Sequence, residues 1–230
     1  MRNYIKNGWN LIPKRTRFWI KTSLVVIVFC LIAFGYGTFK PNKWVKTKII
    51  NDTENQMVTE WQNFGLHKPS IEYTNNTEFV MSVGRCIDYL NLHLLHRDRV
   101  QKYIILPMAV LETGWGKSRF AKEANNLFGI RTWDPNVPQL KPLELPNADF
   151  GVKKYLSKCD SVEDMINIIN RHPAYEDFRI ERATQLESGK IDIDKQIEYL
   201  SKWSTNPEYT SLVKMKAKAV KELLEDKLEN

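Results

Sequence analysis

One segment near the start of the sequence restricts the fold more than any other feature. Residues 22–39 read TSLVVIVFCLIAFGYGTF and contain no charged side chain. As an α-helix, a segment of this length spans about 27 Å, close to the ~30 Å thickness of the hydrocarbon core of a bilayer. Trp19 and Trp44 lie just outside its two ends, where interfacial aromatic residues are common in membrane proteins. We therefore expect residues 22–39 to form a transmembrane helix.

The charges are divided unevenly between this end of the chain and the remainder. The 230 residues carry 34 Lys and Arg against 27 Asp and Glu, a net charge of +7. Residues 1–51 hold ten of the cations and no acidic residue, so the remainder, with 24 cations and 27 acids, has a net charge of −3. A basic balance often indicates a nucleic-acid partner, but here it belongs to the segments that flank the apolar stretch. We expect a lipid bilayer as the partner of this region, and no nucleic acid.

The distribution of cations also predicts an orientation. Six precede the apolar segment and four follow it, a weak bias that favours a cytoplasmic N-terminus. We expect a basic cytoplasmic tail at residues 1–21, a signal anchor of the inner (cytoplasmic) membrane at 22–39, and a periplasmic chain beyond residue 40. The alternative is a cleaved signal peptide, for which residues 33–35 (Ala-Phe-Gly) offer the nearest cleavage site.

The three cysteines are too few for a disulfide scaffold. Cys30 lies in the predicted span. Cys86 and Cys159 would both lie in an oxidising compartment, where they could form a disulfide. Two free buried thiols are the alternative.

Beyond the span, the sequence predicts a linker with a helical extension over residues 40–76 and one domain over residues 77–230. We expect residues 40–52 to form a short basic linker. Apolar residues at helical spacing predict domain helices at residues 77–96, 100–112, 118–124, 161–171, 175–188, 193–203 and 208–228. Four prolines between residues 133 and 150 exclude a helix there, and we expect a loop or small hairpin, with a strand within 148–156. The fold class is α+β, predominantly α, with a small β or loop lobe.

The segment with the clearest chemistry is residues 106–133. Glu112 ends an apolar helix and is followed by Gly114-Trp115-Gly116. A carboxyl group half-enclosed by apolar side chains has a raised pKa, which a general acid requires near neutral pH. A glycine-flanked indole can pack against a sugar ring. In the alternative interpretation Glu112 only caps or salt-bridges the helix end, and Trp115 belongs to the core.

This segment resembles the signature of the glucosaminidase family, glycoside hydrolase family 73. The family has a Leu-Glu-Ser-Gly-Trp-Gly run followed by Asn-Asn-Leu-Phe-Gly-Ile, and this sequence has both, at residues 111–116 and 125–130, with Thr113 in place of serine. His-Pro-Ala-Tyr at residues 172–175, followed by Phe-Arg at 178–179, resembles the Bax-like branch of that family. The resemblance runs in order from about residue 77 to about residue 225.

The resemblance implies a lysozyme-like α+β fold and an endo-β-N-acetylglucosaminidase that cleaves β-1,4 bonds after N-acetylglucosamine in peptidoglycan. Glu112 would be the catalytic acid. A second carboxylate would lie ~5–5.5 Å away in a retaining enzyme or ~6.5–9.5 Å away in an inverting one. Of Asp134, Glu144 and Asp149 in the proline-rich stretch we expect Glu144, with Asp134 as the alternative. Substrate assistance by the acetamido group of the sugar is a further possibility.

The sequence departs from the family pattern at one informative position. Residues 203–209 resemble the family's Tyr-Ala-Thr-Asp-Pro-x-Tyr segment, but Trp203 replaces the first tyrosine. Tryptophan can stack on a sugar but supplies no hydroxyl, so either Tyr199 or Tyr209 replaces that hydroxyl or activity is reduced. The residues that we expect to bind substrate are Trp115, Asn125, Asn126, Phe128, Trp203 and Tyr209.

Other functional classes are less well supported by the sequence. His93 and His96 are three residues apart on a predicted helix, but no third ligand follows at a recognisable spacing, so we expect no metal site and no cofactor. Two alternatives to hydrolysis remain: cleavage of the lytic transglycosylase type, and a peptidoglycan-binding or assembly module without activity on the same fold.

Overall fold

The computed structural model describes residues 12–39 and 42–225. The chain divides into two compact units, one ending at Thr53 and the other beginning at Glu54. Predictions for residues 1–11 and 226–230 lie outside the described residues.

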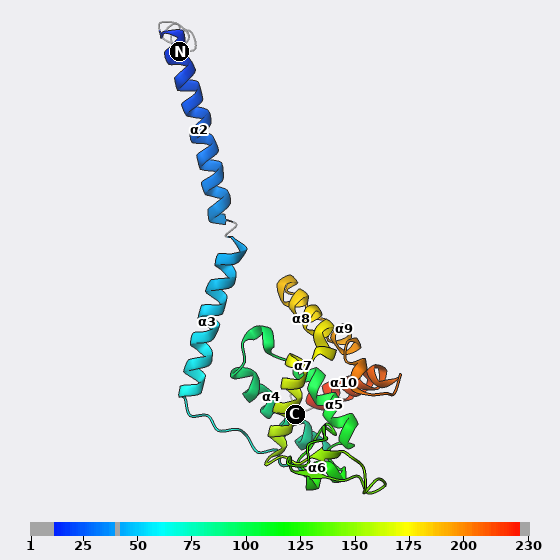
Figure 1. Ribbon diagram of the computed structural model, residues 1–230. Helices are drawn as coiled ribbons and strands as arrows, with labels where there is room; N and C mark the ends of the chain where they lie inside the picture. The colour runs from blue at the N-terminus through cyan, green and yellow to red at the C-terminus, as the bar shows by residue number, and fades with distance from the viewer. Residues whose placement is uncertain (1–11, 40–41, 226–230) are drawn as a thin grey trace. The chain divides into compact units, whose positions relative to one another are not determined.

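The first unit contains the predicted membrane segment within a long helix, α2 (Lys14–Phe39) (Figure 1). Lys14–Tyr36 is long and apolar enough to cross a membrane, with a mean hydropathy of 2.2, and none of this stretch is buried. A helix of a soluble core would bury such side chains. A signal sequence can have the same length and hydropathy, so the retained anchor stays a prediction. The next helix, α3 (Lys43–Asn63), begins where the sequence suggested a linker.

The second unit is predominantly helical with one small sheet, which confirms the predicted α+β class (Figure 1). Its α-helices are α4 (Asn76–Leu92), α5 (Lys102–Thr113), α6 (Arg119–Glu123), α7 (Lys158–Arg171), α8 (Glu176–Ser188), α9 (Ile193–Glu198) and α10 (Tyr209–Glu225). Its 3-10 helices are η1 (His96–Asp98), η2 (Pro173–Tyr175) and η3 (Ser201–Trp203).

Local capping explains where several of these helices begin. The Ser157 side chain accepts a hydrogen bond from the Asp160 backbone, and the Asp160 side chain accepts one from the Ser157 backbone. This capping box starts α7 at Lys158, three residues before the predicted start, because it satisfies amide groups that the first helical turn leaves unpaired. Ser118 caps α6 in a similar way through the Ala121 backbone.

The small lobe is a three-stranded antiparallel sheet of order β1-β3-β2. Its strands are short: β1 (Arg131–Thr132), β2 (Gln139–Leu140) and β3 (Gly151–Lys153). The prolines leave most of residues 133–150 without regular structure, as predicted, and β3 lies within the predicted strand region. A side chain at Gly151 would overlap that of Gln139, so any larger residue there would force the Gln139 side chain to move where β2 and β3 meet.

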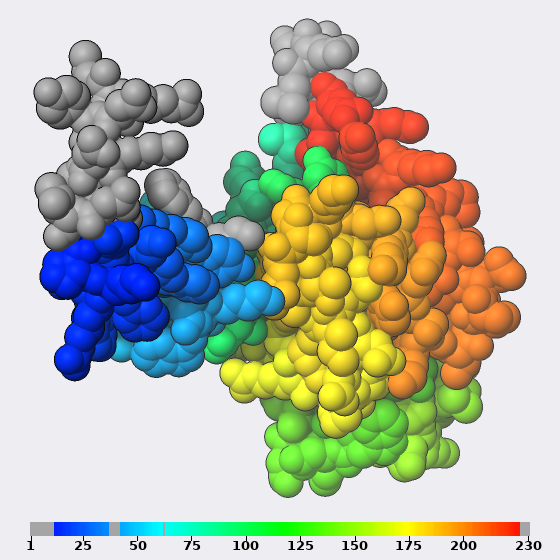
Figure 2. Space-filling model, turned by 90° about the horizontal axis from the view of Figure 1, so that it is seen from above, coloured from blue at the N-terminus to red at the C-terminus, as the bar shows by residue number. Residues whose placement is uncertain are grey.

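Helix α5 is the centre of the hydrophobic core. Its residues 104–106 and 108–110 are at most 1% exposed, and Pro107 between them is buried. Helices α4, α9 and α10 pack against it. Ile71 also belongs to this core, although it precedes the predicted start of the domain at residue 77. Helices α8 to α10, coloured yellow to red, adjoin one another on the face of the molecule shown in Figure 2.

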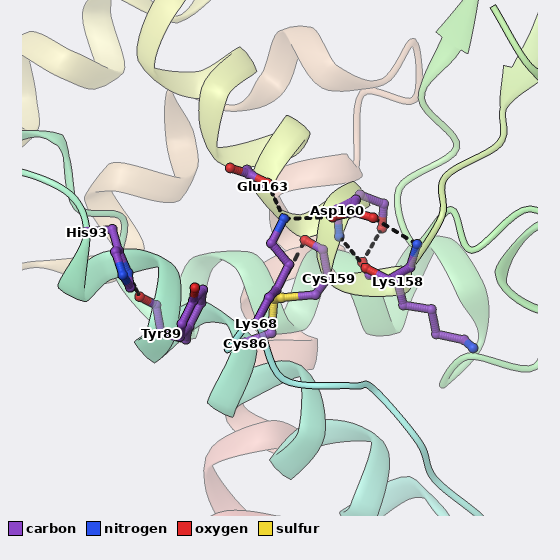
Figure 3. The surroundings of a disulfide bond; sticks show 10 residues. Lys68, Cys86, Tyr89, His93, Lys158, Cys159, Asp160 and Glu163 are labelled. Atoms are coloured by element: carbon purple, nitrogen blue, oxygen red, sulfur yellow. Dashed lines mark hydrogen bonds and ion pairs between the residues drawn. A yellow bond between two sulfur atoms is a disulfide. The ribbon is translucent and has the colours of Figure 1, made fainter. Parts of the chain in front are cut away.

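A disulfide bond between Cys86 and Cys159 joins α4 to α7 (Figure 3). The two Cα atoms are 5.8 Å apart, and both side chains are fully buried. Beside the disulfide, Lys68 forms ion pairs with Asp160 at 2.7 Å and with Glu163 at 2.6 Å. The start of α7 is therefore connected both to α4 and to the segment that precedes α4.

Candidate active site

Glu112 lies in the last turn of α5. Gly114 ends this helix in the left-handed conformation, with φ of 56°. Because α5 is buried over most of its length, the carboxyl of Glu112 lies where the helix leaves the core and meets solvent. The central helix therefore positions the predicted acid on a rigid support.

The turn after Glu112 is held by the hydroxyl of Thr113. This hydroxyl donates to the Ala109 carbonyl at 2.6 Å and accepts from the Gly116 amide at 2.7 Å. Trp115 has φ of 64°, which is uncommon outside glycine, and its half-buried side chain packs against the core. Thr113, which stands where the family pattern has serine, therefore keeps the hydroxyl that holds the turn.

Two residues from the C-terminal part of the chain meet the Glu112 carboxyl. The Trp203 indole Nε1–H donates to Oε1 of Glu112 at 3.2 Å. The hydroxyl of Tyr209, a residue that is 3% exposed, interacts with the same carboxyl but satisfies regular hydrogen-bond geometry with no described group. Tyr209 is the first residue of α10, so the packing of α10 against α5 brings these groups together.

The surroundings of Glu112 act on its pKa in two directions. Desolvation by the surrounding protein raises the pKa of the carboxyl, and interactions with Tyr209 and Trp203 partly offset that increase. Since desolvation dominates, Glu112 holds its proton to a higher pH than an ordinary glutamate. Burial and the neighbouring Glu112 likewise raise the pKa of Tyr209.

Tyr175 is a further member of this cluster, and the sequence alone indicates no role for it at the site. It is 4% exposed, burial raises its pKa to about 12, and its hydroxyl interacts electrostatically with that of Tyr209. The one indication in the sequence is that Tyr175 ends the His-Pro-Ala-Tyr run. His172 of this run caps η2 by accepting a hydrogen bond from the Ala174 backbone. This run therefore places a second buried tyrosine near the one that interacts with Glu112.

The predicted sugar-binding amides have mainly structural contacts. Asn125, with φ of 54°, donates from Nδ2 to the carbonyls of Tyr155 and Leu156, both at 3.1 Å. Its side chain is half-buried, and these bonds connect the end of α6 to the segment after β3.

Asn126 is fully buried. Its Nδ2 donates to the carbonyls of Ile130 and Lys153, and its Oδ1 accepts from the Phe128 and Ile130 amides. These four bonds use all the donors and acceptors of its side chain. Phe128 is 1% exposed and belongs to the core. Both positions therefore shape the lobe from within and present no group to a ligand.

The carboxylates considered as the second acid differ in their surroundings. Oδ1 of Asp134 accepts from the backbone and side-chain nitrogens of Asn136, at 2.9 and 3.0 Å, which holds a tight turn. Glu144 is exposed in the loop between β2 and β3 and has no hydrogen bond or ion pair to any residue that the structure describes. Glu144 is thus the one of these two carboxylates without a structural task.

The two histidines considered as metal ligands lie in different elements: His93 follows the last residue of α4, and His96 belongs to η1. Nδ1 of His93 lies 2.8 Å from the Tyr89 carbonyl, while His96 begins η1. Within residues 12–39 and 42–225, no three side chains of the His, Cys, Asp and Glu types lie close enough together to hold a metal ion.

The sequence matches a family model described as mannosyl-glycoprotein endo-beta-N-acetylglucosaminidase over residues 92–222. Protein bax of Escherichia coli (strain K12) is 34% identical over 91 residues, which are 39% of this chain and 31% of that protein. Exo-glucosaminidase LytG of Bacillus subtilis (strain 168) is 26% identical over 159 residues, 64% of this chain and 55% of LytG.

A third relative, peptidoglycan hydrolase FlgJ of Salmonella typhimurium (strain LT2), is 24% identical over 178 residues, 70% of this chain and 52% of FlgJ. The chain thus spans between about a third and about half of the length of these relatives. The family model covers more than half of the chain, including Glu112, Trp203 and Tyr209. The chain belongs to the glucosaminidase family.

Proposed function

We propose that this protein is a membrane-anchored peptidoglycan hydrolase that cleaves β-1,4 bonds after N-acetylglucosamine, with Glu112 as general acid. The observation that carries the proposal is the Glu112 carboxyl, whose pKa is raised by desolvation and whose Oε1 accepts from Trp203. A protonated Glu112 would donate to the glycosidic oxygen as the bond breaks. The names of LytG and FlgJ support a glycan of the cell wall as substrate.

Trp115, Asn125 and Trp203 would border the bound sugar, and the buried Tyr209 would act through the Glu112 carboxyl. We propose Glu144 as the second carboxylate because it is exposed on the small lobe and has no other partner among the described residues. Asp134 is the alternative, although its carboxylate already holds a turn. Asn126 and Phe128 would act indirectly, by shaping the lobe.

The proposed location is the inner membrane, with the N-terminus in the cytoplasm and the domain in the periplasm. Two observations support it. Helix α2 has the length and hydropathy of a membrane span, and the Cys86–Cys159 disulfide is a bond that persists in oxidising compartments.

The test uses the full chain in detergent micelles with purified peptidoglycan, and it measures the release of reducing ends. Glu112→Gln should lower the rate by ~10²–10⁴-fold, because a general acid contributes about that factor. Glu187→Gln, an exposed glutamate on α8, is the matched control and should retain full activity. No activity in the wild type, or equal activity in a folded Glu112→Gln variant, would exclude the mechanism.

Product masses then distinguish the remaining alternatives. Hydrolysis yields reducing sugars, whereas a lytic transglycosylase yields anhydro sugars, and the size of the fragments separates internal cleavage from terminal cleavage. A loss of activity in Glu144→Gln but not in Asp134→Asn would support Glu144 as the second carboxylate, and the reverse result would support Asp134.

A further inference from the structure

The turn at residues 114–116, which follows Glu112, has an unusual backbone conformation. Gly114, Trp115 and Gly116 have φ values of 56°, 64° and 75°, so three successive residues are in the left-handed region. For Trp115, which has a Cβ, this conformation costs free energy. It persists only where the surrounding structure holds it, and such residues are concentrated at sites that bind or react with a ligand. The contacts that hold this turn therefore bear on the function of the site.

Two hydroxyl groups bond to the backbone of Gly116. Its amide donates to the Thr113 hydroxyl at 2.7 Å, and its carbonyl accepts from the Tyr73 hydroxyl, also at 2.7 Å. Gly116 is buried, so its carbonyl would lose a hydrogen bond that water cannot readily replace if the Tyr73 hydroxyl were absent. The Tyr73 ring approaches so closely because Gly116 has no side chain, since a Cβ there would overlap the ring.

Tyr73 is itself held in place by its neighbours. The preceding carbonyl, of Glu72, accepts from the Ser82 hydroxyl of α4 at 2.8 Å. Ile71 is 4% exposed and belongs to the hydrophobic core. The Tyr73 ring packs edge-on against Phe79 of α4, with the ring centroids 4.8 Å apart. The hydroxyl of Tyr73 is therefore presented to the turn from a fixed position.

Tyr73 precedes the part of the chain that the family model matches. That match begins at residue 92, and the sequence alone predicts the start of the domain at residue 77. Tyr73 and Gly116 are 43 residues apart in sequence. Lys68, in the same segment as Tyr73, forms ion pairs with Asp160 and Glu163 of α7 (Figure 3). The segment before α4 is therefore a packed part of the domain, and one of its side chains reaches the turn beside the candidate acid.

The chemistry of the Tyr73 hydroxyl suits it to hold a carbonyl. Burial raises the pKa of Tyr73, so the hydroxyl keeps its proton at neutral pH and remains a donor. The ammonium group of Lys158 lies 5.7 Å from the centroid of the ring, a distance at which a cation attracts an aromatic face. The ring is thus supported from α7 as well as from α4.

We propose that Tyr73 is a positioning residue for the substrate, whose hydroxyl holds the turn so that the Trp115 indole borders the sugar. This inference rests on the proposed function, because it takes Trp115 as a contact of the glycan. Tyr73 acts through the turn, since its hydroxyl is already bonded to the Gly116 carbonyl. Glu112 precedes the turn and belongs to α5, so loss of the Tyr73 hydroxyl weakens substrate binding more than it slows the chemical step.

The kinetic test compares the wild type with Tyr73→Phe, both as full chains in detergent micelles, on soluble glycan strands prepared from purified peptidoglycan. The variant keeps the ring and loses only the hydroxyl. KM should rise by ~2–10-fold, the factor that corresponds to one hydrogen bond, while kcat stays within about twofold. A merely structural contact would lower Tm and leave KM as in the wild type. An unchanged KM, or a fall in kcat alone, would overturn the role in substrate positioning.

A second measurement does not depend on activity. Hydrogen–deuterium exchange followed by mass spectrometry reports on the amides of Gly116, Lys117 and Ser118, which all donate to Thr113. In Tyr73→Phe these amides should exchange ~2–10-fold faster, because the turn loses one of its hydrogen bonds. Peptides of α8 should exchange as in the wild type. If the wild type cleaves no glycan, the proposed function is excluded, whereas unchanged exchange at these amides overturns the hold of Tyr73 on the turn.

Two further variants locate the effect. In Tyr89→Phe, the matched control, the lost hydroxyl donates to the Leu66 carbonyl at 3.2 Å, a bond of the same type to the same segment that leaves the turn untouched. Its KM and exchange rates should equal those of the wild type. In a Trp115→Ala background, loss of the Tyr73 hydroxyl should raise KM no further, because both changes act on one contact. A further rise of the same size in the folded double variant would show that Tyr73 does not act through Trp115.

Discussion

At Glu112, two opposing influences act on one carboxyl. Desolvation favours the protonated form, while the Tyr209 hydroxyl and the Trp203 indole N–H favour the carboxylate. Trp203 stands where the family pattern has a tyrosine. Its Nε1–H still supplies a hydrogen-bond donor to Oε1 of Glu112, at 3.2 Å. Because the indole N–H can only donate, it stabilises Oε1 of Glu112 as an acceptor oxygen.

Trp203→Phe should shift the pH dependence of kcat/KM. The variant keeps an aromatic ring but loses the N–H that stabilises the carboxylate, so the pKa of Glu112 should rise. Because a general acid must be protonated, activity falls as pH increases through that pKa, and the alkaline limb should move to higher pH. Tyr209→Phe should move it in the same direction.

The matched control for this experiment is Trp61→Phe, which removes an indole of α3 that packs with Phe64, the residue directly after this helix. Its pH profile should equal that of the wild type. An alkaline limb that does not move in Trp203→Phe would show that the indole contributes no stabilisation of the Glu112 carboxylate.

Gly116→Ala should destabilise the domain by about 2–4 kcal/mol, the sum of overpacking and of strain at positive φ. Gly116 has φ of 75°, and a Cβ there would overlap the Tyr73 hydroxyl and the Phe79 ring. Gly189→Ala is the control, because Gly189 also has a positive φ, 71°, but has open space around it. Gly189→Ala should lower the free energy of unfolding by only about 1–2 kcal/mol. If chemical denaturation shows the same loss of unfolding free energy for both variants, the steric argument is contradicted.

At the scale of elements, the site depends on how two helices meet. Glu112 comes from the C-terminal end of α5, and Tyr209 from the N-terminal end of α10, which packs against α5. The short η3 helix brings Trp203 to the same carboxyl. The intervening small lobe is inserted between α6 and α7, where it can carry Glu144 without interrupting this helical core.

The disulfide between α4 and α7 should contribute measurably to stability. It closes a separation of 73 residues in sequence, and such a crosslink restricts the unfolded chain. Reduction, or the Cys86→Ser/Cys159→Ser variant, should lower the free energy of unfolding by about 2–5 kcal/mol. Cys30→Ser, which changes the exposed free cysteine of α2, should leave it unchanged. An unchanged unfolding midpoint after complete reduction would show that the bond is not formed in solution.

At the scale of the whole molecule, the net charge of +7 combines a basic N-terminal region with an acidic remainder. If residues 22–39 span a membrane, the cations that flank this segment in the sequence would meet anionic lipid headgroups. The acidic remainder of the chain has no net attraction to an anionic wall polymer, so recognition of a glycan would depend on short-range contacts near Glu112.

The proposed membrane anchor is tested by fractionation of cells that produce the full chain. It should remain in the membrane pellet after extraction with alkaline carbonate, and intact-mass analysis should find residues 22–39 retained. A variant that lacks residues 1–39 should be extracted. A wild-type chain cleaved near residues 33–35 would instead establish the segment as a signal peptide.

The sequence determined those features that depend on neighbours along the chain. Residues 22–39 are apolar over a membrane thickness, helical periodicity marks the domain helices, and four prolines exclude a helix between residues 133 and 150. Glu112 stood out because its apolar helix and the Gly-Trp-Gly turn are adjacent to it. Such signals are local, so they can be read from order and spacing.

Only the tertiary structure decided which distant side chains meet. It paired Cys86 with Cys159, placed Trp203 and Tyr209 at the Glu112 carboxyl, and brought the Tyr73 hydroxyl to the turn after α5. It also assigned the amide of Asn126 to bonds within the protein. These outcomes depend on the packing of helices far apart in sequence, because burial and hydrogen-bond partners are properties of the packed core and not of any single segment.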